Sequence, residues 1–248
     1  MALSYTYDRL LDIAAEAVGL ARENLSAAEL VRLGEVVNEA CSRIAIKRTW
    51  LHLVKDLTLA LVANDTYVLL PADFLRFHVD SEITYAPGQA YGRVRIVDMS
   101  VIRGARMPGT ISGAPNIAAL GSSESSGADR GRRRLEFFPT SDGTYSWKSS
   151  YYRLPATMSE TTDTPDFPVI LHPAVRLEVQ IGAKEEWNQA VPGEWIGRSE
   201  QCIAEAAAAL GNEARMDSAG LCTVVGGDIG AESGIVRELD VSGLELLP

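Results

Sequence analysis

The sequence predicts an α+β fold: a discontinuous α-helical bundle, an inserted antiparallel β region and an extended C-terminal arm. Three observations lead to this expectation. Apolar residues recur at helical spacing in residues 5–51 and again in residues 166–212, which we expect to form one bundle. Residues 56–155 hold short alternating runs divided by Gly, Pro and Ser, as in a small sheet or sandwich. Residues 213–248 follow neither period and form the expected arm.

Two helices are expected at the start of the chain. Residues Tyr7 to Leu20 place Leu, Ile and Ala on one helical face, and this helix should end at Gly19 or soon after. Ser26 and Glu29 form a capping box, in which each side chain accepts a hydrogen bond from the other residue's backbone N–H. Behind this cap, apolar residues keep helical spacing as far as about Trp50: Leu30, Leu33, Val37, Cys41 and Ile44.

The β region opens with a predicted hairpin. Leu57 to Leu61 alternate in the first strand, Asn64 and Asp65 supply a turn, and Tyr67 to Leu70 form the second strand. Pro71 closes that strand because proline lacks the N–H that a ladder needs. A Ser-rich stretch, Gly121 to Gly131, should be a mobile loop or hairpin tip. Four more β-like runs are Arg93 to Val97, Ile117 to Leu120, Leu135 to Phe138 and Tyr145 to Tyr152.

Helical spacing returns after Pro173. One predicted helix has the apolar stripe Ala174, Leu177, Val179 and Ile181; a second, after the Pro192-Gly193 break, has Ile196, Ile203 and Leu210 in phase. Each predicted helix has only one apolar face and needs a partner, so the opening and closing helices should pack together. Residues Met216 to Pro248 combine many glycines with Val, Ile and Leu, which is too apolar for a solvated tail. We expect this arm to lie on a partner surface.

Composition excludes several classes of function. The chain has 248 residues and a formal net charge of −10, which argues against a free-standing nucleic-acid binder because such affinity depends on neutralising phosphates. An acidic protein can still surround DNA that slides through it. The three cysteines are odd in number and far apart, which argues against a disulfide framework. Neither a signal peptide nor a long apolar span is expected.

No motif in the sequence predicts catalysis, a cofactor or a metal. The three histidines, His52, His78 and His172, fall in different predicted elements. The Gly226 to Gly230 run lacks the Lys-Ser/Thr and the capped helix that a phosphate cradle needs. Neighbouring carboxylates such as Glu185 and Glu186 are expected to be solvated surface. We therefore name no catalytic, cofactor-binding or metal-binding residue.

Two segments are candidate partner-binding sites. Arginines cluster in an otherwise acidic chain at residues 130–134, and three interpretations stay open: a solvated loop, contact with an acidic face of a neighbouring subunit, or contact with DNA phosphate. The apolar residues of the arm are the second candidate. Trp147, Trp187 and Trp195 could anchor an interface or fill the core. The candidate residues are Arg130, Arg132, Arg133, Arg134, Ile229, Ile235, Val236, Leu239, Leu244 and Leu246.

The order of short motifs resembles a known family. A capped helix ends at Arg48-Thr49-Trp50-Leu51, and a strand runs through Tyr67-Val-Leu-Leu-Pro71-Ala-Asp73-Phe74. Then follow Gly113-Ala-Pro115, Leu135-Glu-Phe-Phe-Pro139 and Tyr151-Tyr-Arg-Leu-Pro155, and finally the returning helices. Over about residues 5–212 this order is similar to that of the podophage-type head-to-tail adaptor (connector, head completion, tail tubular A-like) proteins of tailed bacteriophages.

The resemblance implies a structural role and a set of partners. Members of this family form rings, usually dodecameric, below the portal; the rings extend the DNA channel and dock the next tail component. The implied partners are the portal protein, copies of the same chain and a downstream nozzle, stopper or tail-tube protein, with genomic DNA as a non-specific passenger and no membrane. The implied location is the head-tail junction of the virion, assembled in the host cytoplasm. The basic loop at residues 121–134 and the arm after Arg215 depart from the family pattern.

Two other functions stay open. A virion-associated peptidoglycan hydrolase would need a carboxylic acid facing a second carboxylate in a pocket. The chain could also be another structural component, such as a tail terminator or a carbohydrate-binding β module. That function would not explain the helices on either side of the β region.

Overall fold

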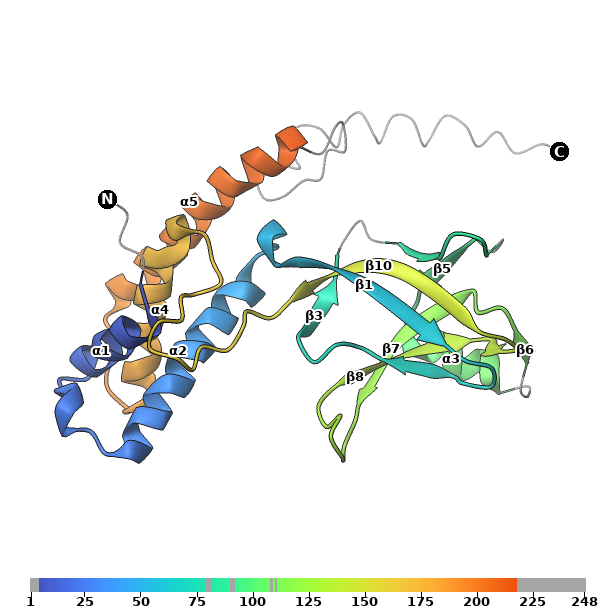
Figure 1. The fold of residues 1–248 in the computed structure, drawn as a ribbon. Coiled ribbons are helices and arrows are strands. Elements are labelled where there is room, and N and C mark those ends of the chain that lie inside the picture. The colour runs from blue at the N-terminus through green and yellow to red at the C-terminus, as the bar shows by residue number, and fades with distance from the viewer. Residues whose placement is uncertain (1–4, 79–81, 90–91, 108, 110, 218–248) are drawn as a thin grey trace. The chain divides into compact units, whose positions relative to one another are not determined.

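A computed structural model describes residues 5–78, 82–89, 92–107, 109 and 111–217, with the backbone alone from 211 onward. The described residues mix five α-helices with a large, mostly antiparallel sheet (Figure 1). The chain divides into two compact units, residues 1–49 with 158–248 (the helical unit) and residues 50–157 (the β unit). The helical unit thus joins segments that the whole β unit separates in sequence.

Four α-helices form the described part of the helical unit. They are α1 (Tyr7–Ala17), α2 (Ala27–Lys47), α4 (His172–Glu186) and α5 (Gly193–Asp217), with short 3-10 turns at Arg22–Asn24 and Val169–Leu171. The capping box predicted at the start of α2 is confirmed: Ser26 accepts from the Glu29 N–H, and Glu29 accepts from the Ser26 N–H at 2.8 Å. The helix ends at Lys47, about three residues before the predicted end.

Helix α4 lies at the centre of this unit. It contacts α1, α2 and α5, and apolar side chains from all four helices are buried: Leu10, Leu33, Val37, Ile44, Val175, Val179 and Ile203. Where α4 meets α2, Gly182 faces Val36 so closely that a Cβ there would be 3.1 Å from the valine. The predicted phase of α5 is correct at Ile203 but wrong at Ile196, which is exposed.

One carboxylate is buried in the core of this unit. Glu178 of α4 is buried, and its Oε1 accepts from Lys47 Nζ of α2 at 2.7 Å and from Ser199 Oγ of α5 at 2.6 Å. A buried carboxylate is tolerated only when it is paired and hydrogen-bonded. This network therefore fixes three helices relative to one another.

The described residues of the β unit form ten short strands and one α-helix. Its main sheet has the order β1-β10-β4-β5-β7-β8-β2, and β3 also pairs with β10. Helix α3 (Met99–Arg106) and the 3-10 turn Leu51–Leu53 complete the unit. The strands are β1 (Val54–Leu61), β2 (Tyr67–Leu69), β3 (Phe74–Phe77), β4 (Ile83–Tyr85), β5 (Arg93–Ile96), β6 (Ser112–Gly113), β7 (Ile117–Ser123), β8 (Arg133–Phe138), β9 (Thr140–Ser141) and β10 (Tyr145–Arg153).

The hairpin predicted from β1 and β2 is wrong, although both strands exist. Strand β1 pairs with β10 along its whole length, from Val54 opposite Tyr152 to Leu61 opposite Tyr145. Strand β2 pairs instead with β8. The turn forms as expected, with Asn64 at φ 70° and the Asp65 N–H donating to Val62 O at 3.2 Å, but its other backbone bonds go to Ser141 of β9. The two strands therefore stand at opposite ends of the strand order, and the turn brings these ends together.

Aromatic packing fills the core of the β unit. Trp147 of β10 is fully buried and stacks on Phe137 of β8, with ring centroids 4.5 Å apart. Tyr85 and Tyr145 pack against the same indole. Alternate residues of β1, Leu57, Leu59 and Leu61, point into this core. The period-2 pattern in the sequence thus identified the buried face correctly, while the pairing of the strands depended on residues far along the chain.

Candidate interaction surfaces

The basic stretch forms the tip of the β7–β8 hairpin. Strands β7 and β8 are antiparallel, and beyond them the Glu124 N–H donates to Arg132 O at 2.8 Å and the Gly131 N–H donates to Glu124 O at 2.9 Å. Gly127 and Gly131 have φ of 79° and 86°, which glycine adopts readily. The sequence left open a loop or a hairpin tip, and the structure places a hairpin tip here.

Two of the four predicted site arginines are engaged within their own chain. Arg132 pairs with Asp129, and its Nε donates to Leu70 O at 2.8 Å. Arg134 pairs with Glu124 at 2.7 Å, and its guanidinium lies 4.5 Å from the centre of the Tyr67 ring. Both arginines therefore tie the hairpin to itself and to β2.

The other two arginines point outward. Arg130 and Arg133 are exposed, and within the described part of the chain neither makes an ion pair at 4 Å or less. Sequence reasoning treated the four arginines as one group because it could not tell which would fold back. The structure leaves Arg130 and Arg133 as the pair that can meet a partner.

The remaining predicted site residues lie outside the described part of the chain. They are the arm residues Ile229, Ile235, Val236, Leu239, Leu244 and Leu246.

The three tryptophans considered as anchors, Trp147, Trp187 and Trp195, divide between core and surface. Trp147 is a core residue and not an anchor. Trp187 and Trp195 are half-buried, and each has a cation over its ring: Arg32 at 5.1 Å and Lys184 at 5.7 Å.

A groove lined by both polar and apolar residues, with an arginine on each wall, lies between α4 and α5. It has a volume of about 550 Å³, and we call it the α4–α5 groove. On α4 its wall includes Arg176 and Leu177; on α5 it includes Trp195 and Arg198. Sequence reasoning missed this groove because its walls come from residues 5, 173–180 and 194–202. One arginine on each side of the Pro192-Gly193 break, Arg176 before it and Arg198 after it, was the only signal for it.

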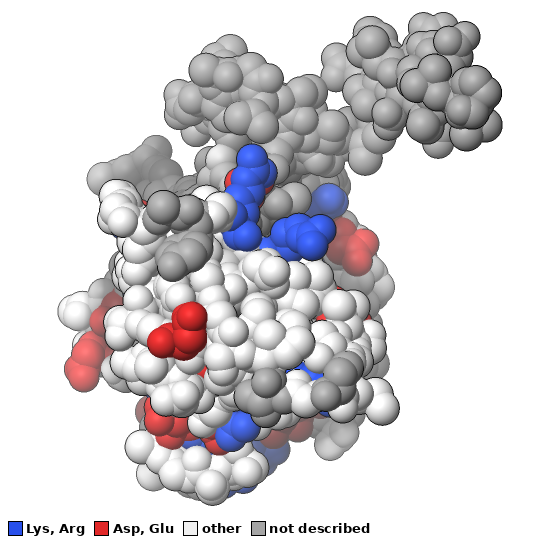
Figure 2. Space-filling view, turned by 90° about the vertical axis from the view of Figure 1, so that its right-hand side faces the viewer, with Lys and Arg blue, Asp and Glu red and all other residues white. Residues whose placement is uncertain are grey.

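One face of the molecule carries few charges. Figure 2 shows a broad expanse of uncharged side chains with acidic and basic groups mainly near its edges. Exposed apolar residues of the β unit include Met107, five residues before β6, at 87%, Ile111, next to β6, at 51%, and Val62, in the segment that bonds to β9, at 55%. The backbone bonds of Asn64 to Ser141 and of Thr140 to Ile111 hold these segments together. An exposed apolar patch of this kind suits contact with another protein.

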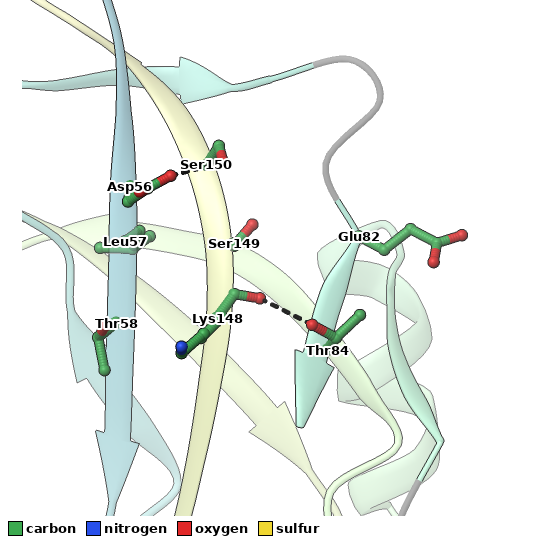
Figure 3. Close-up of a pocket in the computed structure, with 8 residues that line it drawn as sticks. All are labelled: Asp56, Leu57, Thr58, Glu82, Thr84, Lys148, Ser149 and Ser150. Carbon is green, nitrogen blue, oxygen red and sulfur yellow. Dashed lines mark hydrogen bonds between the residues drawn. The ribbon is translucent and has the colours of Figure 1, made fainter. Parts of the chain in front are cut away.

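A shallow polar groove crosses the outer face of β1, β10 and β4 (Figure 3). Its volume is about 380 Å³, and its lining includes the carboxylates Asp56 and Glu82. Asp56 accepts from Ser150 Oγ at 3.4 Å, and Glu82 pairs with Arg93. In Figure 3 the Glu82 side chain points away from Asp56. The general acid of a glycoside hydrolase needs apolar surroundings and a second carboxylate opposite it. Asp56 and Glu82 are both exposed instead.

The other reactive groups have structural roles. His172 is buried beside Tyr5, with its Nε2 3.3 Å from Phe167 O, while His52 and His78 belong to the β unit and lie beside other aromatic rings. Burial raises the pKa of the Cys41 thiol to about 12, with a smaller contribution from Asp166. Among the described residues, no group of three or more His, Cys, Asp or Glu could hold a metal ion. No helix in that part of the chain combines the length and the apolar character needed to span a membrane.

Comparison with known proteins identifies the family. No curated protein matches the chain. A family model described as SU10 adaptor protein matches residues 5–224 of the 248. This match covers both units, and the chain therefore belongs to the SU10 adaptor protein family of phage head-tail adaptors.

Proposed function

We propose that this protein is a connector subunit that forms a dodecameric ring, which sits below the portal, extends the DNA channel and docks the next tail component. The observation that carries the proposal is the family match over residues 5–224. Membership of the family makes the chain a structural protein of the phage virion that interacts with portal and tail components. The ring, its copy number, its position and its assembly in the host cytoplasm belong to the proposal.

Two features support a ring of identical subunits. A ring forms when one surface of a subunit binds a different surface of the next, so that the rotation closes. Arg130 and Arg133 are two exposed cations on a chain with a net charge of −10. Another copy of the chain is therefore a suitable acidic partner for them. The apolar residues around Met107 supply a second surface for contact with the next subunit or with a tail protein.

The acidic charge supports passage of DNA rather than its capture. Phosphate-driven affinity depends on positive charge and decays as salt rises. With 33 acidic and 23 basic residues, a ring of these chains would repel DNA on average and let it slide as a non-specific passenger.

The arm is the proposed anchor to the portal or to a neighbouring adaptor subunit in the assembled ring. Its candidate residues, from Ile229 to Leu246, are apolar, and each fully buried aliphatic side chain contributes about 1.5–3 kcal/mol. Ordering costs about 1–2 kcal/mol per residue, so the arm needs a partner surface to offset this cost.

Size-exclusion chromatography and negative-stain imaging of the protein with its own portal test the proposal. We expect co-elution and ring-shaped density on one end of the portal. Portal particles that stay bare at micromolar adaptor would overturn the proposal. A peptidoglycan zymogram tests the alternative hydrolase function, and we expect no cleared band.

A further inference from the structure

The α4–α5 groove has the chemistry of a binding site for an acidic and apolar peptide. Arg176 and Arg198 line its two walls, and both are exposed. Within the described part of the chain, neither forms an ion pair. Between them, Leu177, Trp195 and Tyr5 are half-buried. Two cations beside an apolar floor bind best to carboxylates that alternate with aliphatic side chains.

The groove is also lined by one acidic residue, Glu194, which makes a densely anionic ligand unfavourable. Glu194 is exposed on the α5 wall, so the charged residues in the lining sum to one positive charge. A densely anionic ligand such as DNA would meet this carboxylate and an apolar floor. A peptide with a few spaced carboxylates fits the lining better.

The chain itself contains such a segment. Residues 238–247, Glu-Leu-Asp-Val-Ser-Gly-Leu-Glu-Leu-Leu, hold three carboxylates, five aliphatic side chains and no Lys or Arg. We call this the acidic segment. The preceding residue, Arg237, is the only basic residue after Arg215. The charge of the acidic segment is thus opposite to that of Arg176 and Arg198.

The acidic segment can reach the groove of its own chain. Helix α5 ends at Asp217, and the groove lies beside its residues 194–202. Fifteen to 23 helical residues correspond to about 22–35 Å at 1.5 Å each. The 20 residues from 218 to 237 span up to about 66 Å when extended. A tether of this kind gives an effective concentration on the order of millimolar, so even a weak contact would be populated.

We propose that in the subunit before assembly the acidic segment binds the α4–α5 groove of its own chain. The carboxylates meet Arg176 and Arg198, and the aliphatic side chains cover Trp195 and Leu177. This inference rests on the proposed function of the arm and deepens it. When the arm binds the portal or a neighbouring subunit, it leaves the groove of its own chain. Both the groove and the arm's apolar residues are then covered until a partner competes for them.

Photo-crosslinking of the full chain, without portal, tests the proposal. With p-benzoylphenylalanine in place of Leu244, mass spectrometry should find crosslinks to residues 173–180 or 194–202 in a product of monomer mass. The double variant R176E/R198E should lose roughly tenfold of this yield, because two exposed ion pairs become repulsive. The variant R130E/R133E, which changes the charge equally on the β unit, should keep the full yield.

A charge swap separates loss of contact from loss of fold. Adding E238R/D240R/E245R to the R176E/R198E chain should restore the crosslinks, because the attraction is restored with the signs reversed. Crosslinks that map elsewhere, that join two chains, or that persist unchanged in R176E/R198E would overturn the inference. Since no portal is present, failure here is distinct from failure of ring assembly, which the imaging experiment measures.

Discussion

At the scale of single residues, the core of the helical unit contains two buried groups with different surroundings, Cys41 and Glu178. Cys41 is an apolar filler in α2 with a neutral thiol, and Glu178 is a charged group enclosed between three helices. Both side chains are buried, and the Glu178 carboxylate is paired with Lys47 and hydrogen-bonded to Ser199. Cys41 therefore tests whether the core excludes reagents, and the Glu178 network tests how much a buried ion pair stabilises the same core.

Cys41 should be unreactive until the helical unit unfolds. Burial raises the pKa of this thiol from its ordinary value of 9.0 to about 12, so the folded thiol stays protonated where an unfolded one ionises. The stability linked to Cys41 is present below pH 9 and falls between about pH 9 and 12, by roughly 1.4 kcal/mol per pH unit. In a C202S/C222S chain, DTNB at pH 8 should label Cys41 only with denaturant. Fast labelling of the native chain would contradict this.

Lys47 should matter more for stability than other charged residues of the helical unit. Lys47→Met leaves the Glu178 carboxylate buried with only Ser199 as a partner, which should cost about 1–3 kcal/mol after allowance for the partial exposure of Lys47. Arg9→Met is the control, because Arg9 is exposed and pairs at 3.5 Å with an exposed Glu16; its cost should be under about 0.5 kcal/mol. Urea unfolding followed by circular dichroism measures both. Equal costs would show that the network does not stabilise the unit.

At the scale of elements, the β7–β8 hairpin combines two kinds of arginine in one tip. Arg132 and Arg134 bind within the chain, while Arg130 and Arg133 point outward. The first pair sets the shape of the tip and the second pair carries its exposed charge. Substitutions should therefore separate shape from binding.

Replacing Arg130 and Arg133 with Ser should weaken assembly without changing the hairpin. Hydrogen exchange at Glu124 and Gly131 should stay as in the natural chain, while the apparent affinity for portal or tail partners falls about tenfold, as expected for loss of two contacts of roughly 0.7 kcal/mol each. Arg132→Ser should have the opposite profile, with faster exchange at the tip because its bonds to Leu69 and Leu70 are lost. If assembly of the R130S/R133S chain is unchanged, the arginines are only solvated.

The elements show which parts of the fold a sequence can predict. The Ser26 cap, the β1 alternation and the Pro173 helix start depend on neighbours within a few residues, so local patterns identified them. Local patterns did not predict which strands pair, because β1 pairs with β10, which lies some 90 residues later in the chain. Helix α3 was missed because it has eight residues, includes Gly104 and buries only Ile102. The same limit applied to the arginines, since their intrachain partners depended on the register of β7, β8 and β2.

At the scale of the whole molecule, two units of different architecture serve one structural role. The helical unit supplies the α4–α5 groove, and the β unit supplies the arginine tip and the apolar patch around Met107. We propose these as protein-contact surfaces of an acidic chain, as suits an adaptor that joins proteins around DNA without binding the DNA tightly.

Cryo-electron microscopy of the portal mixed with the full-length adaptor tests the ring most directly. Symmetry-free class averages should show one closed ring of adaptor copies, as many as the portal has subunits, with the β7–β8 tip of each copy against an acidic face of the next. Isolated adaptor copies scattered on the portal, or a portal without adaptor density, would contradict the account.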